Sequence, residues 1–327
     1  MPVDPGLSTW SDTLLFAAVV AYALAMVAHA AELAFAGRAP VRRAPRVASA
    51  VLAGAGGPPV VATVPASPAP ERRGTVVGRL AIALTALGWA AHLASAVTRG
   101  LAAGRVPWGN MYEFSSMVAL LAVTAYLVLA ARRAAGGLGV FVLLPVVLLL
   151  GLAGTVLYVP AGPLVPALDS YWIKIHVAAA IVAAGTFTVA AVATVLYLVR
   201  AGYDTGRARG ASAATARGLG RLLPTAEALD CTAYRTIAFA FPVWTFAIIA
   251  GAIWAEAAWG RYWGWDPKET WSFVSWVVYA GYLHARTTAG WRGGRAALVA
   301  LVGFAALVFN FFGVNLWITG LHSYAGL

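Results

Sequence analysis

The sequence predicts an all-α integral membrane protein, and its composition carries this prediction. Hydrophobic residues make up 61% of the 327 residues, and charged residues only 11%. Soluble domains have roughly 25% charged residues, so this chain has too few ions to cover a surface that faces water. The mean hydropathy of +0.79 agrees with burial in lipid. We therefore expect a multi-pass protein of the cell (plasma) membrane.

Eight apolar stretches have about the 20 residues that a helix needs to cross a bilayer. In chain order they are 13–36, 77–99, 115–132, 137–159, 172–200, 237–256, 271–290 and 296–318. Each stretch is predicted to form one transmembrane helix.

The segment between the first two helices is predicted to stay out of the membrane. It is apolar around 47–66, but Gly-Gly-Pro-Pro breaks it, and arginines flank it on both sides. Crossing would place one arginine cluster outside the cell. We expect residues 37–76 to form a flexible Pro/Ala-rich cytoplasmic loop. The chain then consists of a first transmembrane helix at 1–36, this loop, and a core of seven transmembrane helices at 77–327.

The basic residues set the predicted orientation of these helices. With eight crossings, residues 37–76, 131–136, 200–236 and 286–295 share one side of the membrane. Together with Arg79 they hold 18 of the 23 Lys and Arg residues. The positive-inside rule places this side in the cytoplasm.

Both termini and the loops at 100–114, 160–171 and 257–270 are therefore predicted to be extracytoplasmic.

The formal net charge of +11 does not indicate a nucleic-acid partner. Its basic residues occur in short runs between apolar stretches, a pattern typical of topology signals.

The predicted outer loop at 257–271 concentrates aromatic rings and charges, in the sequence "WGRYWGWDPKETWSF" (259–273). Six of the 13 tryptophans lie between Trp254 and Trp276. An aromatic belt at a membrane interface would spread its tryptophans over all helix ends. Their concentration here predicts an apolar, π-stacking platform, with Arg261 and Lys268 available for anionic groups.

Five histidines are present, and the predicted topology separates them by depth. His176 and His322 lie at the outer surface, on either side of the tryptophan loop. His284 lies about thirteen residues into the seventh helix, roughly 20 Å inward. His29 and His92 lie within the first two helices, where a histidine often donates a packing hydrogen bond, although intramembrane ionisable groups are also functional candidates.

A tryptophan platform between two histidines suits haem, which is planar and apolar, has two propionates, and carries an iron that takes axial imidazoles. Haem is therefore a candidate ligand of this platform. No nucleophile triad is present in the loop, so we expect no catalytic residue separable from haem binding. Asp266 and Glu269 have two possible roles, as general acids or in capping a helix. Asp-Pro-Lys-Glu is typical of a helix start, which favours capping.

Three motifs resemble those of one protein family. "WGRYWGWDPKE" (259–269) resembles the tryptophan-rich "WWD" signature of haem-handling proteins of cytochrome c biogenesis. "GRVPWGNMYEFS" (104–115) looks like the outer-loop motif of the CcsA/ResC branch, and "GLHSYAG" (320–326) looks like its C-terminal histidine motif. The resemblance extends from about residue 77 to the end of the chain, and it is to the CcsA/ResC-type, or System II, proteins.

The resemblance implies a membrane subunit of a holocytochrome c synthase (haem lyase) that acts with a ResB/CcsB-like membrane subunit. Such proteins bring haem to the outer face and present its vinyl groups to the Cys-x-x-Cys-His motif of apocytochrome c. By position, His176 and His322 match the external axial ligands of the iron, and His284 matches an intramembrane ligand. This chain has a single cysteine, Cys231, so the thiols come from another molecule, and a thioredoxin-like reductant is a further expected partner.

The predicted haem-binding residues are His176, His322, His284, Trp259, Trp263, Trp265, Asp266, Trp271, Lys268 and Arg261. The family has a second intramembrane histidine, which the partner subunit supplies when the two are separate chains. This sequence resembles the unfused form, and whether the partner, His29 or His92 fills that role stays open.

Two other functions are compatible with the motifs. The chain would be a haem carrier or exporter if it passed haem to a separate ligase, as related tryptophan-loop proteins do. A dihaem electron-transfer subunit would need two layers of facing histidine pairs, and the sequence indicates only one clear pair. The motif at 104–115 and the terminal histidine favour the synthase.

Overall fold

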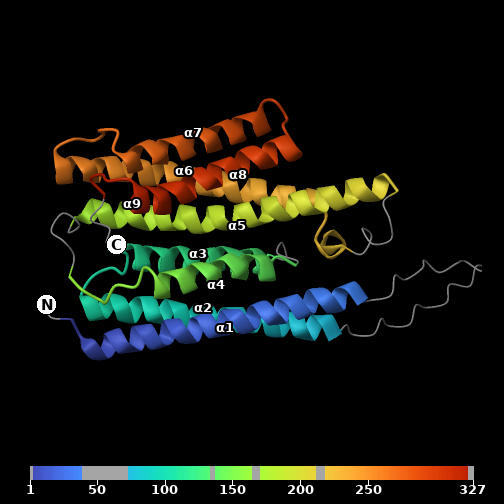
Figure 1. The fold of residues 1–327 in the computed structure, drawn as a ribbon, viewed down its shortest axis with the longest axis horizontal. Coiled ribbons are helices and arrows are strands. Elements are labelled where there is room, and N and C mark those ends of the chain that lie inside the picture. Colours follow the sequence, from blue (N-terminus) through green and yellow to red (C-terminus); the bar gives the residue numbers. More distant parts are fainter. Residues whose placement is uncertain (1–2, 39–72, 133–136, 164–169, 211–217, 323–327) are drawn as a thin grey trace, which may run out of the picture.

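The computed structural model describes residues 3–38, 73–132, 137–163, 170–210 and 218–322, and this part of the chain is helical without a β-strand (Figure 1). Eight helices overlap the eight predicted stretches. They are α1 (Pro5–Arg38), α2 (Arg73–Ala103), α3 (Met111–Ala131), α4 (Gly139–Thr155), α5 (Tyr171–Ala208), α6 (Ala226–Trp259), α7 (Pro267–Thr287) and α8 (Gly294–Val308). A 3-10 turn, η3 (Leu219–Leu222), precedes α6, and a π-helical turn, η4 (Phe309–Gly313), joins α8 to the short helix α9 (Val314–Trp317).

Six of these helical segments are long and apolar enough to cross a membrane, which confirms the all-α membrane class. They are α1, α2, α3, α5, α6 and the continuous segment from α8 to α9. The apolar α4 is shorter, with 17 residues. Helix α7 falls outside the six because serine, charged and aromatic side chains lower its hydropathy. Eight crossings and extracytoplasmic termini stay predictions.

Several helices extend beyond the apolar stretches that predicted them. Helix α5 continues to Ala208, and α6 begins at Ala226, eleven residues before the predicted start at 237. A helix keeps its backbone hydrogen bonds in water as well as in lipid, so it ends where a cap is placed rather than where the apolar residues stop. Thr225 caps α6 by accepting a hydrogen bond from the Ala228 N–H. Of the predicted loop at 37–76, both ends are helical, and residues 39–72 lie outside the described residues.

The helices form two adjoining groups, a first group of α1–α4 and a second group of α5–α9 (Figure 1). Helix α1 packs along α2 and contacts α4, α3 packs on α4 and α5, and α5 packs on α6 and α8. The loops α2–α3, α4–α5 and α6–α7 gather at one end of the bundle, together with both ends of the described chain (Figure 1). We call this end the outer end, following the predicted orientation.

His29 and His92 lie inside the first group and join its helices. The Nε2 atom of His29 lies 3.3 Å from both the Thr85 and the Tyr126 hydroxyl oxygens. His92 contacts the Tyr22 hydroxyl at 3.4 Å and the Ser116 hydroxyl at 2.9 Å. Both imidazoles are buried. These contacts are the packing hydrogen bonds that the sequence favoured for the two histidines.

Candidate functional site

A pocket opens at the outer end of the bundle, between α5, α6, the start of α7 and the α2–α3 loop. It has about 1050 Å³ of empty space, including its open mouth. Five predicted binding residues line it, and they come from three separate parts of the sequence, namely His176, the tryptophan loop with Trp259, Trp263 and Lys268, and His322. The fold thus gathers residues from the middle and the end of the chain around one cavity.

His176 lies in the second turn of α5 and is held by α6. Its Nδ1 atom lies 2.7 Å from the Ala247 carbonyl oxygen. A carbonyl only accepts, so Nδ1 carries the proton and Nε2 carries the lone pair. The ring packs against Gly251, where an added Cβ would lie 2.6 Å from Nδ1. Gly251 therefore provides the space in which this imidazole sits.

His322 is held in the same way by a carboxylate. Its Nδ1 atom lies 2.8 Å from Oδ2 of Asp266, and the N–H of Leu321 donates to Oδ1 at 2.7 Å. Burial alone would raise the pKa of Asp266, but these hydrogen bonds hold it below its ordinary value. Burial lowers the pKa of His322, partly offset by the Asp266 carboxylate. His322 is therefore neutral at pH 7, with its proton on Nδ1.

Asp266 has a second role, which the sequence predicted. It is the N-cap of α7, and with Glu269 it forms a capping box. Glu269 Oε2 also accepts from the N–H of Gly264 at 2.8 Å, so the tryptophan loop is tied to the helix that follows it. Gly320 passes close to this cap, since an added Cβ would lie 2.8 Å from Oδ1 of Asp266. One carboxylate thus starts α7 and orients His322.

Two tryptophans, Trp254 and Trp259, pack beside the two histidines of the pocket. Trp254, which is buried in α6, stacks parallel to His176 at a centroid distance of 6.5 Å and an interplanar angle of 8°. It also lies 5.8 Å from the His322 ring. Trp259 contacts His322 edge to face at 5.0 Å. The walls between the two imidazoles are therefore aromatic and apolar.

The two basic residues of the loop differ in their partners. Arg261 Nη1 lies 2.9 Å from Oε1 of Glu269, and its guanidinium lies over Trp259. Its charge is therefore compensated within the loop. Lys268, in the first turn of α7 and outside the predicted span at 271–290, lines the pocket and forms no ion pair with another described residue. Burial lowers the pKa of Lys268 to about 8, against the opposing effect of Asp266.

Three predicted binding residues lie away from the pocket. Trp265 is exposed and has a left-handed backbone, with φ at 58°, which is uncommon for a residue with a side chain. Trp271 packs on Phe309 at 4.3 Å. His284 is exposed near the end of α7, eighteen residues from Asp266 and therefore roughly 27 Å along the helix. The platform is thus smaller than the sequence predicted, and Trp254 completes it.

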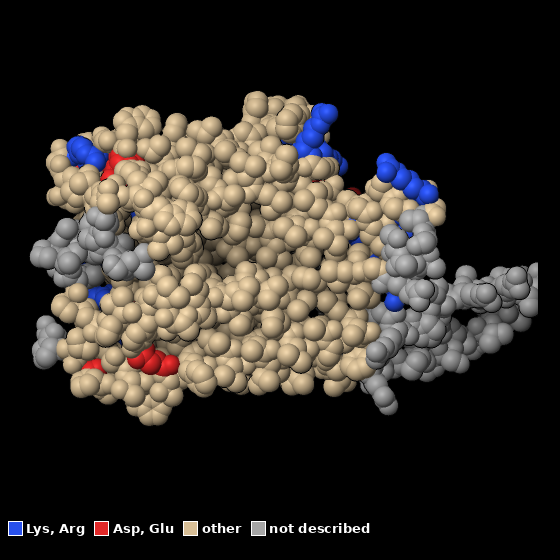
Figure 2. All heavy atoms as spheres, viewed as in Figure 1, with Lys and Arg blue, Asp and Glu red and all other residues tan. Residues whose placement is uncertain are grey.

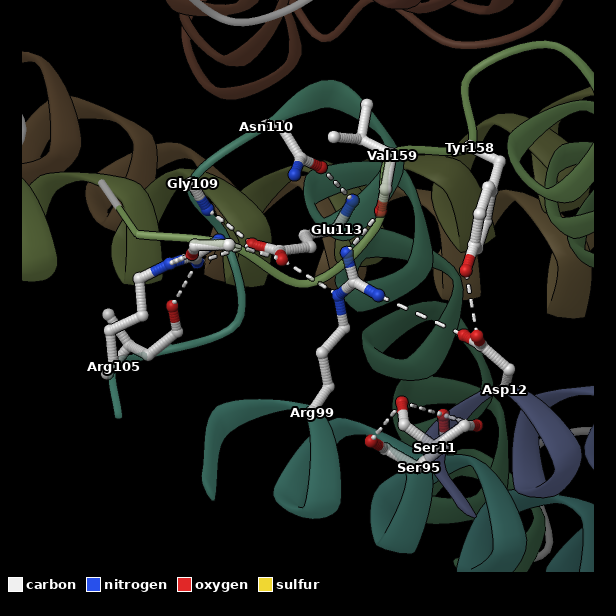
Figure 3. A network of polar contacts seen from close by, with 12 residues as sticks. Ser11, Asp12, Ser95, Arg99, Arg105, Gly109, Asn110, Glu113, Tyr158 and Val159 are labelled. Atoms are coloured by element: carbon white, nitrogen blue, oxygen red, sulfur yellow. Dashed lines mark hydrogen bonds and ion pairs between the residues drawn. The ribbon is translucent and has the colours of Figure 1, made fainter. Parts of the chain in front are cut away.

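The motif at 104–115 forms the opposite wall of the pocket, with Trp108, Met111 and Phe114. Figure 3 shows what holds it. Glu113 is fully buried and accepts from Arg99 Nε at 2.8 Å, from Arg105 Nη1 at 2.7 Å and from the Gly109 N–H at 2.7 Å. Two guanidinium groups and a backbone amide therefore fix this wall through one carboxylate.

The network continues to the first helix and to the loop after α4. Arg99 reaches Asp12 at 3.9 Å and the Val159 carbonyl, and Tyr158 donates to Asp12 at 2.8 Å (Figure 3). Arg105 donates to the Gly162 carbonyl at 2.8 Å. Glu113 and its two arginines thus link four segments at the outer end.

The sequence assigned no role to several other pocket residues. They are Trp244, Gly251, Trp254 and Asn310. Trp254 was part of the tryptophan concentration, but its position inside α6 gave no reason to place it between the histidines. Asn310 lies in the π-helical turn, a backbone irregularity that apolar sequence periodicity does not reveal.

The comparisons with known proteins decide the family. The family described as "Cytochrome C assembly protein" matches residues 108–322, which is most of the chain and includes every wall of the pocket. The chain belongs to the cytochrome c assembly protein family. It is 36% identical over 255 residues to the cytochrome c biogenesis protein CcsA of Trieres chinensis, covering 70% of this chain and 81% of the relative.

The CcsA protein of Synechococcus elongatus is also 36% identical, over 288 residues, which cover 76% of this chain and 87% of that protein. Among solved structures, the cytochrome c haem lyase CcmF has the same fold, with a TM-score of 0.61 at 16% identity. The match covers 95% of this chain and 47% of CcmF. This CcsA-type chain is therefore a multi-pass membrane protein of cytochrome c maturation, a haem-handling process.

Proposed function

We propose that this chain binds haem b, as substrate, in the outer pocket and presents it for covalent attachment to apocytochrome c. His176 and His322 would be the axial ligands of the iron. The observation that carries the proposal is their shared geometry. Each imidazole holds its Nδ1 proton on an oxygen of the protein, so each has the tautomer whose Nε2 binds a metal.

The rest of the pocket fits the same ligand. Trp254 and Trp259 give flat apolar surfaces for the macrocycle. Lys268 is the pocket cation with which a propionate would pair, since Arg261 is neutralised by Glu269. Asp266 acts through His322 as a positioning residue.

The reaction itself needs proximity more than acid–base catalysis. Each thiol of the Cys-x-x-Cys-His motif adds across one vinyl double bond, forming a C–S and a C–H bond without net oxidation. A rigid site that fixes the ring plane and the vinyl edge supplies the orientation for this addition. The thiols must stay reduced and a second subunit must complete the intramembrane site, so we include a thioredoxin-like reductant and a ResB/CcsB-like membrane subunit as partners.

His284 supports a role for this chain in moving haem across the membrane. It lies on the exposed side of α7, far from the outer pocket, where an imidazole would meet the bilayer or another subunit. His284→Ala would lower haem loading of the complex, and exogenous imidazole would restore part of it. Unchanged haem occupancy in this variant would remove His284 from the route.

The direct test is co-expression of this chain with only the ResB-like subunit and an apocytochrome, followed by haem staining of the cytochrome. Wild type should give covalent holocytochrome, and His176→Ala or His322→Ala should give none. A wild-type chain that binds haem but yields no holocytochrome would be a carrier for a separate ligase. Wild-type yields from both variants would refute the proposal.

A further inference from the structure

A second cavity lies beside the outer pocket, deeper in the bundle. Side chains of α3, α4, α5 and the α8–η4 segment border about 700 Å³ of empty space, including its open mouth. Its lining is apolar apart from Ser115 and Thr188. Figure 2 shows a hollow between the two helix groups at the level of these helices. We call this space the lateral cavity.

The lateral cavity reaches the side of the bundle beside the end of α8. Helix α3 packs on α4 and α5, and α5 packs on α8, whereas α4 and α8 pack little on one another within the described chain. Val308, at the end of α8, lines the cavity and is 39% exposed. From Phe114 to Ala122 the cavity extends over nine residues of α3, or about 12 Å.

Two phenylalanines belong to both cavities. Phe114 and Phe311 line the outer pocket and the lateral cavity, and their ring centroids lie 4.7 Å apart. They therefore form the partition between the two spaces. Side chains of this kind change rotamer without disrupting a helix, so a partition of two rings can open.

Each of these rings stands next to a buried polar side chain. Ser115 follows Phe114 and is 1% exposed, and Asn310 precedes Phe311 and is 3% exposed. Neither the Ser115 hydroxyl nor the Asn310 Oδ1 has a hydrogen-bond partner among the described residues. Ser115 lines the lateral cavity and Asn310 lines the outer pocket. A buried polar group without a partner costs free energy unless a ligand or water supplies one, so the pair indicates a ligand with polar groups at the partition.

The backbone at the partition is irregular as well. Asn310 and Phe311 lie in η4, the π-helical turn that interrupts the helix between α8 and α9. Such turns are rare and are frequently found at functional sites. The backbone irregularity therefore coincides with the partition formed by Phe114 and Phe311.

We propose that the lateral cavity is an entrance by which haem leaves the bilayer and reaches the outer pocket, passing between Phe114 and Phe311. This inference rests on the proposed function of that pocket. The apolar lining accepts the macrocycle, Ser115 and Asn310 serve its polar substituents in turn, and continuity with the outer pocket distinguishes this occupant from a lipid chain, for which a polar pair has no use.

The test measures how fast the purified chain in phosphatidylcholine vesicles gains histidine-ligated haem absorbance. Haem is supplied either dissolved in the bilayer or on albumin in the external water. Val308→Trp should fill the cavity mouth and slow loading from the bilayer by about tenfold, while loading from albumin and the final spectrum stay unchanged. Val302→Trp is the matched control, because Val302 lies on the same helix, is 49% exposed and lines neither cavity.

A second pair of variants, on α4, tests the same cavity from another helix. Leu149→Trp plugs the cavity from α4, and Leu148→Trp, which points away from it, is its control. Loading from the bilayer at control rates in both plugged variants would show that the cavity holds a lipid chain only, and the inference would be wrong. Equal slowing from both haem sources would also overturn it. If wild type gained no haem from either source, the proposed function itself would fail.

Discussion

The carboxylate of Asp266 lies 2.8 Å from Nδ1 of His322, across 56 residues of sequence. The same carboxylate caps α7. The tryptophan loop and the C-terminal histidine are therefore one structural unit, and the cap that begins a helix also sets the tautomer of the proposed iron ligand.

Asp266→Asn separates these two roles. Asparagine is as good an N-cap as aspartate, so α7 should keep its stability, while His322 loses the anion that orients it. We expect haem affinity to fall roughly 10–100-fold, the usual effect of removing such a partner. Titration of the purified chain with haem measures it. Asp204→Asn, the same change at the opposite end of the bundle, is the control, and equal affinities of the two variants would contradict the assignment.

Gly251→Ala tests the position of His176. The new methyl would lie 2.6 Å from Nδ1 of the imidazole, so the ring must move and its bond to the Ala247 carbonyl must break. Haem affinity should fall even though alanine favours the helix. In Gly281→Ala, nothing described lies within 4 Å of the new methyl, and stability should rise by about 0.5–1 kcal/mol with haem affinity unchanged. Matching haem titrations for the two variants would count against the role of Gly251.

Glu113→Gln tests the network that holds the Trp108 wall. The substitution leaves Arg99 and Arg105 buried without their shared carboxylate, which should lower the free energy of unfolding by about 3–5 kcal/mol. Denaturant unfolding in detergent measures the loss, with the exposed Glu256→Gln as control. A change below 1 kcal/mol, within the range of a surface ion pair, would mean that the network contributes little.

The pocket should bind haem within a limited pH range. Acidification through the lowered pKa of His322 protonates the imidazole, which then no longer binds iron, so affinity falls on the acid side. Above a pH of about 8, Lys268 loses the proton that attracts a propionate, so affinity falls on the alkaline side as well. Lys268→Met should abolish the fall of haem affinity at alkaline pH and leave the fall at acid pH unchanged. If the variant still lost affinity at alkaline pH, another group would be responsible for that loss.

Much of the fold was predictable from the sequence, because eight apolar stretches map onto eight helices. The limits of those helices were less predictable, since hydropathy reports where lipid begins and caps such as Thr225 determine where a helix begins. The π-helical turn at 309–313 had no signal at all, because its residues read as a continuation of an apolar helix.

The site was predictable where a residue type carries its own chemistry. His176, His322 and Lys268 meet in one pocket because loops on the same side of the membrane gather at one end. Trp265 and Trp271 show the limit of the approach, since their neighbours in the loop face the pocket and they do not. The roles of Trp254 and Gly251 could not be predicted from the sequence, because they depend on the packing of α5 against α6.

The most direct test of the central claim is the absorption spectrum of the purified chain with reduced haem, compared with those of His176→Ala and His322→Ala. Wild type should show the bands of an iron with two axial imidazoles. Each variant should lose them, and added imidazole should restore them. Bis-imidazole spectra in both variants without added imidazole would contradict the account.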